Sequence, residues 1–268
     1  MNALAANIIP ARAAPALLTD DAVISAQGVA KVFNRDVVAL ESASFDIKRG
    51  TFVSLVGPSG CGKSTLLRLI AGLIGKTSGS LSVLGKEVNG PSSDVGMMFQ
   101  RPTLLEWRTA VENVLLPTEV RSKPTSADKE RAIALLRLVG LKDFEFSFPR
   151  QLSGGMQQRV ALARLLQTGA NILLLDEPFG ALDEFTRERL NLELLRIVDD
   201  VDATSLFVTH NISEAIFLAD QVMVMTPRPG RLAKIVDVPF ARPREISLMQ
   251  TPAFNEMVSE VRAILGGH

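Results

Sequence analysis

The sequence contains no tyrosine, only one cysteine and no surplus of either charge. Lys and Arg together number 29, and so do Asp and Glu, which makes the formal net charge zero. Binding to a nucleic-acid backbone needs a clear basic surplus, so we do not expect nucleic acid as the main partner. Cys61 has no second cysteine in the chain to pair with, which excludes an internal disulfide and favours a reducing compartment.

Long apolar runs are also missing, since no segment approaches the ~20 residues that a membrane-spanning helix needs. Residues 1–21 are rich in alanine, but their only cation, Arg12, lies in the middle of the segment. A secretory signal places its basic residues before the apolar stretch, so none is expected here. We interpret residues 1–22 as a flexible N-terminal extension.

The rest of the chain has the composition and the periodicity of an α/β protein. With 268 residues, 47% of them apolar, it can bury a sizeable core in one or two domains. The first β-type runs, 23–33, 37–47 and 51–56, predict antiparallel strands that lead into one buried strand. The later segments alternate between strand and helix, which is typical of a parallel sheet covered by helices. We expect strands at 80–83, 95–99, 172–176, 205–209 and 222–225, and helices at 63–71, 153–168, 184–198 and 212–219.

Two further regions differ from this alternation. From about residue 101 the pattern becomes helical, and Ala132, Leu135, Leu136 and Val139 form one apolar helix face that ends at Gly140. The segment 226–244 is rich in Pro, Gly and Arg and predicts a loop or a weak strand. A last amphipathic helix follows, and the favoured interpretation is that its apolar face packs on the chain's own core. That face consists of Phe254, Met257, Val258, Val261 and Leu265.

The clearest motif is a complete G-x-x-x-x-G-K-S phosphate loop between an apolar strand and an amphipathic helix. Its glycines let backbone N–H groups surround the phosphates, and the following helix directs its positive end toward them. Lys63 supplies a mobile cation and the Ser64 hydroxyl can bind Mg²⁺. A chance glycine turn is improbable in this context. The residues expected to bind the nucleotide here are Gly57, Pro58, Ser59, Gly60, Cys61, Gly62, Lys63, Ser64 and Thr65.

Cys61 lies inside the phosphate loop, where a thiolate would feel the helix end and Lys63. The favoured interpretation of its native role is an inert small side chain. We nevertheless expect alkylation of the thiol to block ATP binding, and MgATP to protect against it.

Two carboxylates end an apolar run at residues 172–178, Ile-Leu-Leu-Leu-Asp-Glu-Pro. Asp176 is expected to hold Mg²⁺ through water, and Glu177 to orient and deprotonate the water that attacks the γ-phosphate. The alternative is a simple acidic turn after a strand, which loses weight once the phosphate loop is present.

Gln100 and His210 each follow a predicted strand. Gln100 can ligate Mg²⁺ and contact the attacking water, although a Gln in such a place is usually a surface residue. His210 is often structural at such a position, but its strand should lie beside 172–176. A neutral imidazole there could hydrogen-bond the γ-phosphate and the attacking water. Glu177, His210, Gln100 and Lys63 are therefore the predicted catalytic residues, and Ser64, Gln100 and Asp176 the predicted metal ligands.

A second anion site and a base-stacking residue complete the set. Ser153, Gly154 and Gly155 offer a hydroxyl and two unobstructed amides at a helix N-terminus. An ordinary Ser-Gly cap would explain these three residues alone, but not the longer string 152–160. Phe33 lies in the β region before the phosphate loop and can stack on adenine, for roughly 1–3 kcal/mol. The alternative is a core phenylalanine.

Together these motifs resemble the ATP-binding subunit of an ABC transporter over roughly residues 24–226. Gly57–Thr65 is similar to the Walker A motif and Ile172–Glu177 to Walker B. Gln100 resembles the Q-loop, Leu152–Gln158 the family signature, Ala181–Asp183 the D-loop and His210 the switch histidine. In this family two copies pair head to tail, so that each ATP is held between one copy's phosphate loop and the other's signature turn. The resemblance adds Gln157 and Asp183 to the nucleotide-binding residues and implies ATP and Mg²⁺ as cofactors.

The resemblance also implies a fold class and a domain layout. We predict an α/β fold with a P-loop NTPase core, a parallel sheet flanked by helices. An N-terminal antiparallel β subdomain and an inserted α-helical subdomain, at about 101–158, complete this ATPase domain of residues 23–250. Residues 251–268 form the C-terminal helix.

Within the family the chain looks most like importer ATPases of the nitrate/sulfonate/taurine type. The similar strings are Phe99-Gln100-Arg101-Pro102 with Leu104–Val114, and Glu214–Arg231. Many relatives carry Pro where this chain has Glu106 before Trp107, which bears on the fit to a membrane partner. The resemblance implies uptake of a small solute and favours an anion of the nitrate, sulfonate or taurine type. It implies an ATP-bound homodimer, permease subunits and, indirectly, an extracytoplasmic solute-binding protein, at the cytoplasmic face of the inner membrane.

Two other functions remain alternatives at this point. A soluble ABC-type ATPase that acts on nucleic acid or ribosomes would carry a long coiled-coil insertion, a second ATPase unit or a basic surface, and none is visible. In a P-loop kinase or GTPase the signature turn would be a coincidence.

Overall fold

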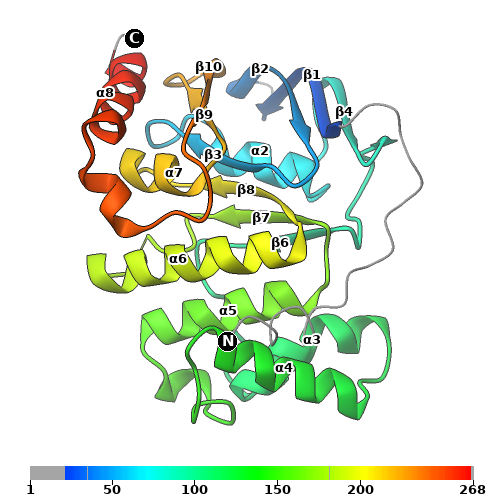
Figure 1. Ribbon diagram of the computed structural model, residues 1–268. Helices are drawn as coiled ribbons and strands as arrows, with labels where there is room; N and C mark the ends of the chain where they lie inside the picture. Colours follow the sequence, from blue (N-terminus) through cyan, green and yellow to red (C-terminus); the bar gives the residue numbers. More distant parts are fainter. Residues whose placement is uncertain (1–21, 35, 181, 267–268) are drawn as a thin grey trace.

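The computed structural model describes residues 22–34, 36–180 and 182–266, and its strands form one ten-stranded sheet (Figure 1). The strand order is β5-β4-β1-β2-β10-β9-β3-β8-β7-β6. The extension expected at residues 1–22 lies outside the described part, apart from Ala22. The strands are β1 (Ala22–Phe33), β2 (Val37–Lys48), β3 (Phe52–Val56), β4 (Ser78–Val83), β5 (Lys86–Glu87), β6 (Val95–Met98), β7 (Ile172–Asp176), β8 (Thr204–Val208), β9 (Gln221–Met225) and β10 (Gly230–Asp237).

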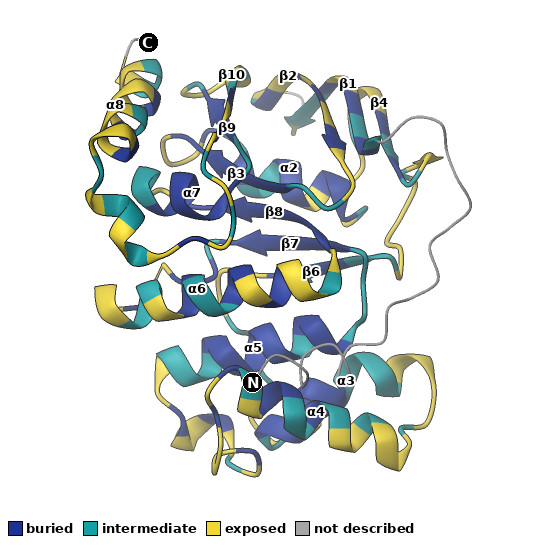
Figure 2. Ribbon diagram, in the orientation of Figure 1, coloured by how far each residue is buried: buried dark blue, intermediate teal, exposed yellow. Residues whose placement is uncertain are grey.

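The two ends of this sheet differ in strand direction. β9, β3, β8, β7 and β6 are parallel, whereas β1 pairs with β2 and β4 in antiparallel fashion. Every residue of β3, β7 and β8 is buried, because helices cover both faces of the parallel part (Figure 2). This explains why these strands are continuous apolar runs in the sequence, and it confirms the predicted α/β fold class.

β10 joins the two parts of the sheet. It runs antiparallel to β9 along most of its length and pairs in parallel with β2 through Gly230 and Arg231. The sequence predicted only a loop or weak strand between residues 226 and 244, because this segment is rich in Pro, Gly and Arg. Pairing on both sides, rather than its own composition, therefore makes this segment a strand.

The helices form two groups on opposite faces of the parallel strands (Figure 1). α2 (Lys63–Ile70) packs between the parallel and antiparallel strands, and its leucines join the core of both. On the other face lie α5 (Gly154–Gln167), α6 (Glu184–Val201) and α7 (Ile212–Leu218). α3 (Ala110–Arg121) and α4 (Ser126–Leu138) pack on α5 beyond them.

The C-terminal helix α8 (Pro252–Gly266) packs beside α7 (Figure 1). Phe254, Val258 and Val261 are buried in the main core, and the Phe254 ring stacks on Phe240 with centroids 5.9 Å apart. This confirms the interpretation that the last helix covers the chain's own core. Among the helices of the described residues, none is both long and apolar enough to cross a membrane.

Candidate nucleotide site

Four neighbouring parallel strands bring the predicted site residues to one edge of the sheet. β3 leads into the phosphate loop at Gly57, and β7 ends at Asp176. β8 is followed closely by His210 and β6 by Gln100. Carboxyl ends of parallel strands are the usual place for a ligand site in an open α/β sheet. The neighbouring positions of β7 and β8 confirm the placement expected for His210.

The phosphate loop has the backbone geometry that an anion site requires. Gly62 precedes α2 with φ 101°, and Gly60 has φ 78°, a region that residues with a Cβ rarely adopt. No side chain caps α2, so its first N–H groups remain available to a phosphate. Lys63 is 7% exposed and donates through Nζ to the carbonyls of Gly57 at 2.7 Å and Pro58 at 3.0 Å. The cation expected to be mobile is thus held inside the loop.

Cys61 faces the interior and not the nucleotide side of the loop. Its side chain has no exposed surface and belongs to the core cluster that includes Leu66 and Met225. Lys63 Nζ lies 3.9 Å from the sulfur. Packing under the loop removes the thiol from solvent, so a reagent can reach it only when the loop opens. The expected block of ATP binding by alkylation, and the protection by MgATP, stay predictions.

Ser64 and Asp176 form the candidate metal site. The Ser64 hydroxyl donates to Asp176 Oδ1 at 2.8 Å, and the aspartate is only 4% exposed. Burial raises the pKa of Asp176, and the hydrogen bond from Ser64 opposes that effect. A cation would offset the burial of this carboxylate. Mg²⁺ typically takes one or two protein oxygens and completes its shell with phosphate and water, so this donor pair fits it.

Glu177 is placed by an unusual backbone conformation. Its φ is 48°, in the left-handed region, and its N–H donates to Val208 O at 3.0 Å. A residue with a Cβ in this region costs roughly 1–2 kcal/mol, which the pairing with β8 offsets. In this conformation the carboxylate lies next to Gln100 and His210.

Two other predicted residues converge on this carboxylate. Gln100 Nε2 donates to Glu177 Oε2 at 3.0 Å, and His210 Nδ1 lies 3.8 Å from the same oxygen. The His210 side chain is 63% exposed and the Glu177 side chain 22%. The side chains of His210 and Glu177 are therefore both accessible to a bound ligand. The structure thus unites Glu177, Gln100 and His210 from three different strands.

The second anion site lies away from the first. Ser153 caps α5 by accepting from the N–H of Met156 at 3.3 Å, and Gly154 and Gly155 form the first turn. α5 and α2 lie on opposite faces of the parallel strands (Figure 1). Within residues 22–34, 36–180 and 182–266, no hydrogen bond joins this turn to the phosphate loop. One chain therefore offers two separate helix N-termini as candidate phosphate sites.

Two residues that the resemblance added have internal partners. Gln157 donates through Nε2 to the carbonyls of Pro149 at 3.0 Å and Leu152 at 3.3 Å, which shapes the turn before α5. Asp183 caps α6 by accepting from the N–H of Thr186 at 3.0 Å, and this bond lowers the pKa of its carboxyl. Ala181, the first residue of this loop in the sequence comparison, lies outside the described residues.

Phe33 is the last residue of β1 and is 37% exposed, so it is not a core phenylalanine. Lys31 Nζ lies 5.0 Å from the centroid of its ring and donates to Gly75 O at 2.6 Å. This cation fixes one contact of the ring, while the exposed part remains available to a base.

Several residues that support the site gave no signal in the sequence. Gln158 Nε2 donates to Gln100 O at 2.8 Å, and Arg164 donates to Pro102 O at 2.6 Å, so α5 holds the segment after Gln100. Asn113 is fully buried and accepts from Leu105 N–H at 2.8 Å. A polar residue on the buried side of a helix is the only sequence feature that could have indicated these roles.

Comparison with known proteins agrees with this geometry. Residues 40–180 match the ABC transporter family. The chain is 45% identical over 238 residues to the taurine import ATP-binding protein TauB of Rhizobium johnstonii, across 87% of this chain and 91% of that protein. It is 42% identical over 224 residues to the aliphatic sulfonates import ATP-binding protein SsuB of Bacillus cereus, across 82% and 88%. A solved dimeric ATP-binding cassette in a post-hydrolysis state, bound to ADP and Pi, is similar with a TM-score of 0.72 and 31% identity. That match covers 81% of this chain and 100% of that one.

Proposed function

Since the chain belongs to the ABC transporter family, we propose that its ATPase activity drives uptake of a small anion of the nitrate, sulfonate or taurine type. The observation that carries the catalytic part is the convergence of Gln100 and His210 on one oxygen of Glu177. The similarity to the taurine and aliphatic sulfonates import proteins above supports the solute class.

Hydrolysis needs a base beside the attacking water, and Glu177 is placed for that role. Gln100 donates to the Glu177 oxygen nearer His210, and this hydrogen bond orients the carboxylate. The exposed His210 imidazole can hydrogen-bond the γ-phosphate. Ser64, Asp176 and Gln100 would hold Mg²⁺, which when bound neutralises charge on the phosphate oxygens. Lys63 adds a fixed positive charge within the phosphate loop.

Because the two candidate anion sites of one chain lie apart, we propose that the active form is a dimer in which both sites contact the same nucleotide. A head-to-tail pair would bring Ser153, Gly154 and Gly155 of one copy onto the nucleotide held by the other copy's phosphate loop. ATP then joins the two molecules, and its cleavage releases them. The likeness to a dimeric cassette supports this arrangement.

The docking face for a permease is proposed to lie between Gln100 and Trp107. Trp107 is 73% exposed, and Phe146 from the segment before α5 is 62% exposed, which provides aromatic anchors for a partner helix. Gln158 and Arg164 join this segment to the signature helix. Glu106 lies 3.7 Å from Arg150 there. Docked to a permease through this segment, the chain would lie at the cytoplasmic face of the inner membrane, and a solute-binding protein would act on the other side.

The substitution Glu177→Gln tests the catalytic assignment. It removes the base and keeps the phosphate loop, so turnover should fall by about 10²–10⁴-fold while the Kd for MgATP stays within a few-fold. Light scattering should show dimers of this variant in MgATP. Glu256→Gln, an exposed change on α8, is the matched control. Near-normal turnover, or a strictly monomeric variant in saturating MgATP, would contradict the proposal.

The single tryptophan gives a direct test of docking. Binding of a permease should bury Trp107 and shift its emission to shorter wavelength. An affinity-tagged chain should also co-purify with an integral membrane protein. Co-purification with nucleic acid or ribosomes, without a membrane protein, would favour the soluble ABC-type alternative.

A further inference from the structure

We propose that Arg244, in the segment between β10 and α8, is a positioning residue that acts through helix α7 on His210. Arg244 itself lies at the end of α7 away from the nucleotide site. The inference rests on the proposed role of His210 and adds a structural element that sets where the imidazole lies. It assigns a function to the segment after β10, which the catalytic mechanism does not otherwise use.

The N-terminal end of α7 is hydrogen-bonded to the residues on both sides of His210. α7 has seven residues and starts directly after Asn211, whose side chain accepts from the N–H of Glu214 at 3.1 Å. The Glu214 carboxylate is buried and accepts from the Thr209 hydroxyl on one side and from Asn191 Nδ2, at 3.1 Å, on the other. A shift of α7 therefore moves the residues on both sides of His210.

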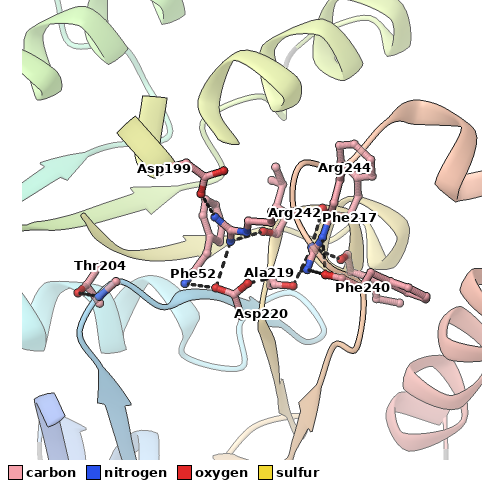
Figure 3. Close-up of polar contacts among 12 residues, drawn as sticks. Phe52, Asp199, Thr204, Phe217, Ala219, Asp220, Phe240, Arg242 and Arg244 are labelled. Carbon is pink, nitrogen blue, oxygen red and sulfur yellow. Dashed lines mark hydrogen bonds and ion pairs between the residues drawn. The ribbon is translucent and has the colours of Figure 1, made fainter. Parts of the chain in front are cut away.

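The C-terminal end of α7 is hydrogen-bonded by the guanidinium of Arg244 (Figure 3). Its Nη1 donates to the carbonyls of Ile216 at 3.1 Å, Phe217 at 2.8 Å and Ala219 at 2.8 Å. Its Nη2 and Nε donate to Phe240 O, at 2.8 and 3.1 Å. One guanidinium thus binds the last turn of the helix to the chain that follows β10.

A second arginine extends this connection into the core (Figure 3). Arg242 pairs with Asp199 at the end of α6 and donates to Asp220 Oδ2 at 3.1 Å. The same Asp220 oxygen accepts from the N–H of Phe52, the first residue of β3, at 2.8 Å. The arginine segment is therefore fixed to α6, β9 and β3, and gives Arg244 a rigid support.

Burying the charged guanidinium of Arg244 costs free energy of desolvation, which indicates that this residue serves to orient α7. Its side chain has no exposed surface, and its nearest carboxylate oxygen, Asp220 Oδ1, lies at 3.8 Å. Burial lowers the pKa of the guanidinium to about 10. Buried charges of this kind are often no more stabilising than apolar side chains, whereas their directional bonds select one arrangement of the surrounding elements. Here the selected arrangement is the position of a short helix that begins beside His210.

The expected consequence is a loss of turnover without a loss of nucleotide affinity. Arg244→Gln removes donors to the end of α7 but leaves the phosphate loop and Phe33 unchanged. We expect kcat to fall about fivefold to tenfold, with KM and the Kd for MgATP within twofold. Arg244→Lys, which keeps the charge, should recover part of the loss. Arg262→Gln, the same change at an exposed site on α8, is the matched control.

A double-mutant cycle in the full-length chain separates positioning from general damage. If Arg244 acts through His210, Arg244→Gln should change the residual rate of the His210→Ala protein less than twofold. An equal loss in both backgrounds would overturn the inference. If His210→Ala alone keeps normal turnover, the proposed function fails instead, which distinguishes the two failures.

NMR provides a readout that does not depend on turnover, and Arg244→Lys serves if the glutamine variant does not fold. The chain has two histidines, so the ring signals of His210 can be assigned by comparison with His210→Ala. They should shift in the Arg244→Lys protein and stay unchanged in the Arg262→Gln control. Unchanged His210 signals in a folded Arg244→Lys protein would overturn the inference.

Discussion

Gly230 lies so close to Cys61 that a Cβ atom on the glycine would stand 1.9 Å from the Cys61 carbonyl oxygen. The same atom would lie 3.1 Å from Ala39 O. The first residue of β10 and the phosphate loop are therefore in direct backbone contact, although nearly 170 residues separate them along the chain. This contact fixes the position of the phosphate loop against the start of β10.

Gly230→Ala should consequently displace the phosphate loop. Its backbone amides must match the phosphate oxygens closely, so we expect the Kd for MgATP to rise by about tenfold or more, which corresponds to about 1.4 kcal/mol. Gly75→Ala is the matched control, since a Cβ there meets no atom within 4 Å. Equilibrium binding of a fluorescent ATP analogue measures both. Equal affinities for the two variants would show that the contact does not shape the loop.

Phe33→Ala should weaken nucleotide binding by roughly 1–3 kcal/mol, because base stacking on the ring is lost. Phe33→Trp should retain the affinity of the natural protein, since it keeps an aromatic face in the same place. The loss should be similar for ATP and ADP, which carry the same base. A phenylalanine that serves only to pack β1 would instead lower the melting temperature and leave the nucleotide affinity unchanged.

Asn113→Ala should loosen the segment that contains Trp107. The buried Asn113 amide bonds Leu105 N–H and donates to the carbonyls of Leu105, Arg108 and Thr109, at 3.0 to 3.1 Å. Without these bonds the segment gains mobility, and the fluorescence anisotropy of Trp107 should fall. Asn255→Ala on α8 is the control. Unchanged anisotropy in the Asn113 variant would mean that other contacts hold the docking face.

The start of α3 should be sensitive to acid. Hydrogen bonds from the Thr109 backbone and hydroxyl lower the pKa of Glu112, in a reciprocal cap. A carboxyl with a depressed pKa contributes stability that is present above its unfolded value of about 4.3 and is lost as the pH falls through its folded value. Glu112→Gln should therefore cost about 0.3–1 kcal/mol near neutral pH and much less in acid. Urea unfolding at several pH values measures this difference, with Glu130→Gln, an exposed change on α4, as the control.

Cys61 should react slowly with thiol reagents in the native chain. Its side chain is fully buried, so reaction requires the phosphate loop to open. Bound MgATP should hold the phosphate loop closed and slow the reaction further, whereas unfolding in urea should make the reaction fast. Kinetics with a chromogenic disulfide follow all three states. A native rate equal to the unfolded rate would contradict the buried position.

Much of the site could be predicted because its motifs are local. The phosphate loop, the pair Asp176 and Glu177, and the cap Ser153 each depend on a few consecutive residues whose chemistry is readable in order. Parallel strands also collect at one edge whatever lies at their carboxyl ends, which is why the strand before His210 was correctly expected beside 172–176, and why Gln100 also reaches Glu177.

Two features that the sequence could not show have a common physical origin. β10 was expected as a loop or weak strand, but pairing with β9 and β2 on its two sides makes it an eight-residue strand. The neighbours of Cys61 in the sequence could not indicate its burial, which depends on which face of the loop packs against β2 and α2. Neither outcome is contained in a short window of residues.

The sequence by itself determined the chemistry of this protein, since the order of its motifs specifies an ATP site and an α/β core. Only the tertiary structure decided how that chemistry is held. It brought Gly230 against the phosphate loop, placed Gln158 on the segment after Gln100, and buried Arg244 at the far end of the helix that follows His210. The chemistry of a motif depends on residues that are neighbours in the chain, so it can be read from the sequence. The residues that hold the site in place act through contacts with distant parts of the chain, and these contacts exist only once the hydrophobic core has fixed how strands and helices pack.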